Sequence, residues 1–262
     1  MTLVAIIFGT LIAGIGSVWL AAALSFGVLA KYTQHMLSLA AGALLATAFM
    51  HLLPEAFESQ ASPHELFAAL LVGLVFFFLL DKAELWHHGH EHGHGHGHSH
   101  AQPDHGHSNS SKSGGWAVLA GDSVHCFGDG ILIASAFMAD MRLGIVASLA
   151  VLAHEVPHHM GDLVVLSQSS NNNRRAAIAK VSMAGAVTAL GGVLGFLLVE
   201  QLYDFLPFFL ILASSSFMYV ALADLIPQLQ KRLSPRETAA QIAWLFVGIG
   251  LVTLISGVAH AH

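Results

Sequence analysis

The sequence contains little charge and almost no cysteine. Only 10% of its 262 residues are Asp, Glu, Lys or Arg, whereas 55% are hydrophobic. A soluble domain cannot hide that much apolar surface, so we expect an integral membrane protein surrounded by lipid. The ten Lys and Arg residues form no basic tract, which argues against nucleic acid as a partner. Cys126 is the only cysteine, which excludes an internal disulfide and a multi-cysteine zinc module.

Long apolar stretches recur along the chain. About twenty apolar residues are needed for a helix to cross the hydrocarbon core of a bilayer. The first stretch lacks a basic n-region and a cleavage pattern, so we expect it to be an uncleaved span. The sequence therefore predicts an all-α bundle of eight transmembrane helices, near residues 3–24, 35–54, 64–85, 115–139, 144–168, 178–200, 205–227 and 240–259.

One histidine-rich segment interrupts this pattern. Residues 87–114 hold ten histidines among Gly and Ser, a composition that cannot build a core. We predict a disordered cytosolic loop that binds metal loosely and buffers or senses it, with a hydrophilic spacer as the alternative. The predicted parts of the chain are helices 1–3 in residues 1–86, this loop in 87–114, helices 4–5 in 115–168, and helices 6–8 in 169–262.

The basic residues are distributed unevenly between the two sides of the predicted bundle. Nine of the ten lie in loops or span ends on one side, and Arg142 lies on the other. Because cytoplasmic loops of membrane proteins carry an excess of Lys and Arg, we expect both termini outside and the histidine-rich loop in the cytosol.

Two predicted spans contain similar segments. His51-Leu52-Leu53-Pro54 in the second span resembles Asp224-Leu225-Ile226-Pro227 in the seventh, and the two spans run in opposite directions. This match favours an inverted repeat, with three helices on each side of a central pair in a 3+2+3 arrangement. It also makes His51 and Asp224 candidates for an ion path.

The fourth and fifth spans carry two chelating pairs near their midpoints. His125 with Asp129, and His154 with His158, are four residues apart and therefore share one face of a helix. Neither span contains a Lys or Arg that could neutralise the carboxylates. Ionisable groups at membrane depth usually mark a transport path or another functional site, and a divalent cation would supply the charge that they need.

The residue types point to the metal. Imidazole and carboxylate ligands, with a thiolate as a further option, suit zinc, whereas calcium and magnesium prefer oxygen ligands. Cd²⁺, Fe²⁺ and Mn²⁺ are alternative cargoes. Cys126 is either a ligand or a small core residue. Pro157 frees a backbone carbonyl inside its helix. Three glycines are expected to allow close helix approach beside the ligands: Gly128, Gly130 and Gly161.

The two motifs, His125-Cys126-Phe127-Gly128-Asp129-Gly130 and the segment His154 to Asp162 (HEVPHHMGD), resemble those of the ZIP family of zinc transporters. The similarity is to the LIV-1-like branch, whose fifth helix carries HExPHExGD. The resemblance implies movement of metal into the cytosol by alternating access, with the ion bound at the midplane between helices 4 and 5. It implies a primary site of His125, Asp129, His154 and His158. It places Cys126, Glu155, His159, Asp162 and Asp224 in a second site or pathway, with Asp129 shared.

This sequence departs from the family pattern at two positions. Cys126 stands where the family usually has Asn, and His159 stands where it usually has Glu. A thiol and an imidazole thus replace an amide and a carboxylate. The second site is therefore expected to be softer and to carry less fixed negative charge than in relatives.

The main competing hypothesis is an enzyme. His154-Glu155-Val156-Pro157-His158 satisfies the HExxH pattern of zinc proteases, so an intramembrane metalloprotease is the alternative function. Pro157 interrupts the helix of that motif, and a filled coordination shell would leave no place for catalytic water. We therefore expect a transporter and no enzyme. We expect the protein to lie in the cell membrane, with a bacterial inner membrane as the expected location. Assembly into a homodimer is an open alternative.

Overall fold

The structure is a computed structural model that describes residues 1–25, 33–89, 110–169, 173–230 and 233–260. Eight long helical segments follow the eight apolar stretches, and several consist of consecutive shorter elements. The predicted all-α membrane architecture is confirmed. The segments are α1 (Thr2–Leu11) with η1 (Ile12–Gly16) and α2 (Ser17–Ser25); α3 (Thr33–Thr47) with η3 (Ala48–Leu52) and α4 (Leu53–Phe57); α5 (Pro63–Gly89); α6 (Ser110–Ala139); α7 (Met141–Ser169); α8 (Arg174–Gln201); η4 (Tyr203–Phe205) with α9 (Leu206–Tyr219), η5 (Val220–Leu225) and α10 (Ile226–Leu229); and α11 (Pro235–His260).

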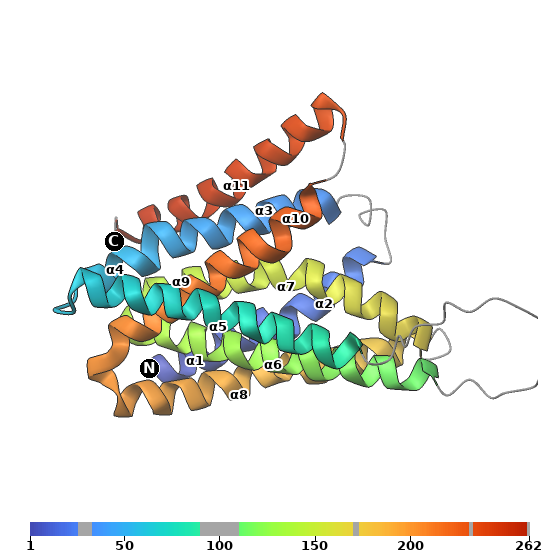
Figure 1. The fold of residues 1–262 in the computed structure, drawn as a ribbon, viewed down its shortest axis with the longest axis horizontal. Coiled ribbons are helices and arrows are strands. Elements are labelled where there is room, and N and C mark those ends of the chain that lie inside the picture. Colours follow the sequence, from blue (N-terminus) through green and yellow to red (C-terminus); the bar gives the residue numbers. More distant parts are fainter. Residues whose placement is uncertain (26–32, 90–109, 170–172, 231–232, 261–262) are drawn as a thin grey trace, which may run out of the picture.

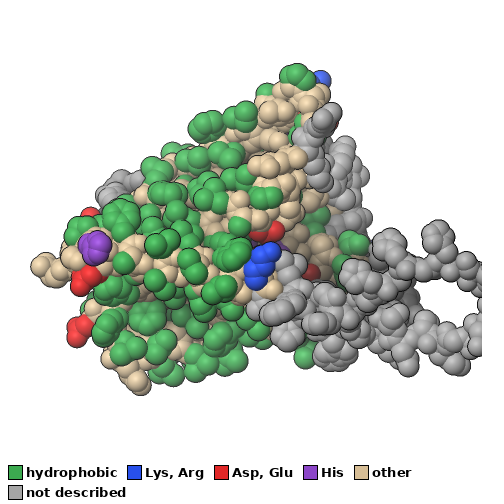
Figure 2. All heavy atoms as spheres, viewed as in Figure 1, with side chains coloured by type: hydrophobic (Ala, Val, Ile, Leu, Met, Phe, Trp, Pro, Cys, Tyr) green, Lys and Arg blue, Asp and Glu red, His purple; other side chains and the backbone are tan. Residues whose placement is uncertain are grey.

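Most of these segments are long and apolar enough to cross a membrane. Within the described residues, six meet that requirement, and α6 and α7 are the two long helices outside this set, because polar side chains interrupt them. The flank of the bundle presents hydrophobic side chains, whereas acidic and histidine side chains gather at the end that carries α4 (Figure 2). The protein is thus a multi-pass membrane protein.

The start of α1 and the end of α11 lie at the same end of the bundle (Figure 1). This arrangement agrees with an even number of spans. Residues 90–109 of the predicted histidine-rich loop lie outside the described residues. At its two ends, residues 87–89 belong to α5 and residues 110–114 belong to α6, so the helices extend further than the apolar stretches alone predict.

The second and third helical segments repeat in the seventh and eighth. In each copy a π-helical segment, η3 or η5, leads into a short helix that contains proline. The next helix then begins with a capping box, in which a serine and the glutamate three residues later bond to each other's backbone N–H. These boxes are Ser62 with Glu65 and Ser234 with Glu237. The two copies run in opposite directions along the bundle (Figure 1), as an inverted repeat requires.

The helices α6 and α7 form the centre of this arrangement. α6 packs against α8 and α9, while α7 packs against the first helical segment and α3. A single residue, Asp140, connects α6 to α7, and its Oδ1 accepts hydrogen bonds from the backbone N–H groups of Arg142 and Leu143. This cap begins α7 immediately after α6 and holds the two helices antiparallel and adjacent.

Glycine allows α6 and α8 to cross closely beside the polar residues. A Cβ at Gly130 would collide with the backbone oxygen of Thr188, and one at Gly191 would collide with that of Phe127. By contrast, a Cβ at Gly128 or Gly161 would have no neighbour within 4 Å. The expectation that glycine permits close helix approach is therefore confirmed at Gly130 and wrong at Gly128 and Gly161.

Candidate metal centre

Four side chains from α6 and α7 form what we call the first group: His125, Asp129, His154 and Glu155. One ligand atom from each lies within 4.8 Å of all the others. His154 Nε2 lies 3.3 Å from Asp129 Oδ2 and 3.0 Å from Glu155 Oε1. His125 Nε2 lies 3.3 Å from the same Glu155 oxygen and 3.3 Å from His154 Nε2. Two imidazoles and two carboxylates thus converge on one point.

The orientation of His154 suits a metal ligand. Its Nδ1 lies 3.4 Å from the backbone oxygen of Ala150, one turn earlier in α7. A carbonyl can only accept a hydrogen bond, so Nδ1 is the donor in this contact, and Nε2 is the ring nitrogen that faces the first group and is free to bind a cation there. A backbone carbonyl behind a metal-binding histidine commonly fixes the ring in this way.

A second group lies beside the first and consists of Asp122, Cys126, Glu155 and His159. All four side chains are buried. His159 Nε2 lies 3.1 Å from Glu155 Oε2 and 3.4 Å from Asp122 Oδ1. Cys126 Sγ lies 3.7 Å from the same two oxygens. The two carboxylate oxygens of Glu155 therefore face different groups, and this residue connects them.

Ser17, in the first helical segment, holds His159 in place. Its hydroxyl donates to the backbone oxygen of Gly14 at 2.5 Å and lies 3.0 Å from His159 Nδ1. Because the hydroxyl proton is engaged with Gly14, the serine oxygen accepts from Nδ1–H, and His159 Nε2 is left to face the carboxylates. Both buried histidines thus present Nε2 to a ligand group.

A third group consists of Asp122, His158 and Asp162. His158 Nδ1 lies 3.3 Å from Asp162 Oδ2 and 3.8 Å from Asp122 Oδ1. The His158 ring stacks on His125, with centroids 5.6 Å apart and an interplanar angle of 29°. The side chains of His125 and His158 are 31% and 41% exposed, so these two rings form the open side of an otherwise buried site.

The structure groups the sequence-predicted residues in a specific way. Three members of the predicted primary site meet in the first group with Glu155, and His158 lies in the third group. The residue shared by the first two groups is Glu155, where the resemblance implied Asp129. Asp224 belongs to none of the three groups; it is exposed on η5 and accepts a hydrogen bond from Gln228 Nε2 at 2.8 Å.

The sequence interpretation missed Asp122 and Ser17. Asp122 precedes Cys126 by four residues, the same spacing that identified the other chelating pairs, so the signal was present. A serine in an apolar span has no such signal, because its role depends on which helix packs against it.

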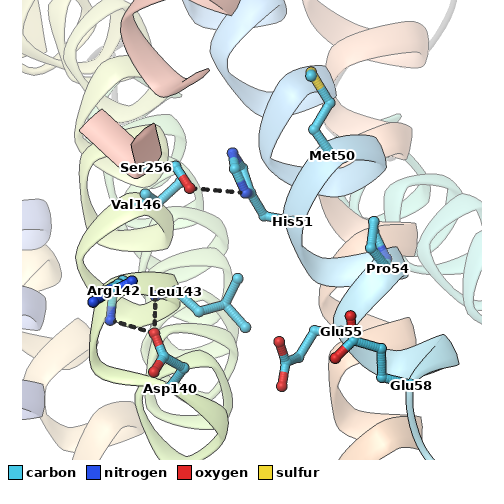
Figure 3. A pocket seen from close by; sticks show the side chains of 10 residues that line it. All are labelled: Met50, His51, Pro54, Glu55, Glu58, Asp140, Arg142, Leu143, Val146 and Ser256. Carbon is cyan, nitrogen blue, oxygen red and sulfur yellow. Dashed lines mark hydrogen bonds between the residues drawn. The ribbon is translucent and has the colours of Figure 1, made fainter. Parts of the chain in front are cut away.

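His51 lies elsewhere, in a pocket at the end of the bundle that carries α4. This cavity has a volume of about 390 Å³ and is also lined by Glu55, Glu58, Asp140 and Arg142. The carboxylate of Glu55 faces the gap between α4 and α7, whereas that of Asp140 is turned toward the start of α7, and His51 lies further along the bundle, near Ser256 (Figure 3). Because the lining has more carboxylates than basic groups, the pocket is expected to attract cations.

The donor set of the centre defines what it can bind. Among the described residues, the ion-pairing partners that the structure gives Asp122, Asp129, Glu155 and Asp162 are histidines. Nitrogen, carboxylate and thiol ligands of this kind suit zinc and similar borderline cations. The two histidines of the HExxH pattern, His154 and His158, belong to different groups, which is unlike a protease site. Fold and site together define a multi-pass membrane protein whose helical bundle contains buried side-chain groups that could hold a metal ion.

Comparison with known proteins identifies the family. The model described as ZIP Zinc transporter matches residues 1–111 and 80–256. The chain therefore belongs to the ZIP family of zinc transporters, and the protease hypothesis has no support. Zinc transporter ZIP13 of Danio rerio is 33% identical over 55% of this chain and 42% of its own length. Zinc transporter ZIP13 of Pongo abelii is 27% identical over 87% of this chain and 68% of its own length. Zinc transporter ZIP4 of Homo sapiens is 33% identical over 54% of this chain and 21% of its own length. The chain thus spans from about a fifth to two thirds of these relatives.

Proposed function

We propose that this protein transports zinc, or a similar divalent cation, through the membrane by alternating access. One observation carries the proposal: two ligand groups that share the buried Glu155 lie between the central helices of a membrane-spanning inverted repeat. Transporters commonly bind their cargo at such a position, between repeats and away from both surfaces. Membership of a family of zinc transporters supports zinc as the cargo.

In this proposal the first group is the primary binding site and the second group is a neighbouring site. His125, Asp129, His154 and Glu155 would hold the cation with two nitrogen and two oxygen ligands, a set that suits zinc. Cys126 and His159 make the second group softer. Because Glu155 faces both groups, a cation can move between them without losing all of its protein ligands.

The direction of transport and the topology are further parts of the proposal. We propose that both termini lie outside and that metal moves into the cytosol. The unequal distribution of basic residues along the sequence supports this orientation. A bacterial inner membrane as the location and assembly into a homodimer remain predictions, to be checked by cell fractionation and by the mass of the purified complex.

The direct test is zinc flux in proteoliposomes that contain the purified full-length chain and a zinc-sensitive dye. We expect flux down an imposed zinc gradient, reduced by competing Cd²⁺ more than by Mg²⁺. Liposomes with the same amount of heat-inactivated protein provide the background. Flux at the background level from correctly folded protein would refute the proposed function.

A further inference from the structure

The third group has properties that the primary and neighbouring sites do not explain. Asp122, His158 and Asp162 bring two carboxylates and one imidazole together, with ligand atoms within 4.8 Å of one another. The Asp122 side chain is only 2% exposed. Within the described structure, its Oδ2 atom is buried and has no hydrogen-bond partner, whereas Oδ2 of Asp162 lies 3.3 Å from His158 Nδ1. Leaving such a buried acceptor unsatisfied costs about 1–3 kcal/mol, so a positively charged ligand is expected there.

The third group is displaced along the bundle from the first. Asp162 follows His154 by eight residues, which corresponds to about 12 Å along α7 at 1.5 Å per residue. On the antiparallel helix α6, Asp122 precedes Asp129, which moves it in the same direction. This is the end of the bundle where α6 begins and α7 ends, opposite the termini (Figure 1).

Carboxylates connect the three groups in sequence. Glu155 belongs to the first and second groups, and Asp122 belongs to the second and third. Exposure is lowest in the second group, whose four side chains are buried, and it is higher in the third group, where His158 is 41% exposed and Asp162 is 13% exposed. In the first group His125 is 31% exposed. A cation that moves from one group to the next therefore keeps one carboxylate ligand at each step.

We infer that Asp122, His158 and Asp162 form a third cation site, which connects the first two groups to the end of the bundle opposite the termini. Its ligand set and its exposed side suit a zinc-like divalent cation that completes its coordination with water. The role as a station on the path rests on the proposed function. Cation binding at these residues can be tested without flux.

The test uses the full-length chain with Asp162→Cys, in detergent, and Cd²⁺ as the probe metal. We expect Cd²⁺ to protect the introduced thiol from a maleimide, as measured on its peptide by mass spectrometry. Adding His158→Ala should raise the protecting Cd²⁺ concentration at least about tenfold, since even supporting residues of metal sites are worth 10- to 100-fold in affinity. Gly161→Cys is the matched control, because Gly161 is exposed and its Cβ position is open. Its thiol should not be protected.

Equal labelling of the Asp162→Cys thiol with and without Cd²⁺ would overturn the inference. Protection that survives His158→Ala, or equal protection of the Gly161→Cys thiol, would overturn it as well. The native carboxylate is tested by Asp162→Asn, which should slow zinc flux at least about tenfold if it removes a ligand. The two measurements test different claims. If Cd²⁺ protects the thiol but the wild-type protein shows no zinc flux, the proposed transport function is refuted and the third cation site stands. If the wild-type protein shows flux but the thiol is not protected, the third cation site is refuted and the transport function stands.

Discussion

The hydroxyl of Ser17 lies 3.0 Å from Nδ1 of His159, although the two residues are 142 positions apart in the sequence. Ser17 begins α2 directly after the π-helical segment η1, and its own proton is engaged with Gly14 in that segment. The first helical segment therefore determines which nitrogen of His159 faces the second group.

Removing this support should weaken cation binding in the second group. We predict that Ser17→Ala raises the half-saturating zinc concentration for flux by about 10- to 100-fold, the usual effect of losing a residue that orients a metal ligand. Ser214→Ala is the control, because Ser214 is buried but donates to Leu210 within its own helix. Equal changes in the two variants would show that Ser17 acts only through packing.

The thiol of Cys126 should set the preference for soft metals. Thiolate favours soft cations more than carboxylate or imidazole does, so Cys126→Ser should lower Cd²⁺ flux more than Zn²⁺ flux. The measurement is the ratio of the two fluxes in the same proteoliposomes, which corrects for differences in protein content. An unchanged ratio would identify Cys126 as a packing residue.

Two neighbouring glycines in α6 should respond oppositely to the same substitution. Gly130→Ala places a methyl group against the backbone of α8 and should cost about 1–3 kcal/mol in stability. Gly128→Ala meets open space and should be neutral or stabilising by up to about 1 kcal/mol, because alanine is the better helix former. Thermal unfolding of the two variants in detergent tests this, and a similar loss in both would contradict the α6–α8 packing described above.

The acidic pocket beside His51 should collect cations. Glu55→Gln removes one of its carboxylates, so the half-saturating zinc concentration should rise, and the effect should shrink at high salt as the pocket's field is screened. Glu200→Gln is the control, because Glu200 is exposed near the end of α8 and does not line the pocket. A rise that is the same at low and high salt would contradict an electrostatic role.

Much of the fold follows from the sequence because membrane spans require a fixed apolar length. Hydropathy locates apolar stretches, however, and not helix ends, so it misses the start of α6 at Ser110. The internal repeat was detectable at His51 and Asp224. Two further features of the repeat were not detected. The π-helical segments depend on backbone geometry, and the capping boxes follow the segments in which His51 and Asp224 lie.

The site was predictable where one helix alone determines the geometry. The four-residue spacing of His125 and Asp129 places both side chains on one face of α6, and the same spacing places Asp122 and Cys126 on one face. Which residues of α6 meet which residues of α7 depends on how the two helices are offset, and that offset is set by the turn at Asp140. This is why Glu155 emerges as the shared ligand only in the structure.

The central claim is that the first group binds the transported cation. It is tested most directly by zinc flux in proteoliposomes that contain Asp129→Ala or His154→Ala, beside Asp204→Ala, which removes an exposed carboxylate in η4. All three proteins should fold alike by circular dichroism. We predict that Asp129→Ala and His154→Ala each abolish flux, whereas Asp204→Ala transports like the wild type. Undiminished flux in both site variants would contradict the account.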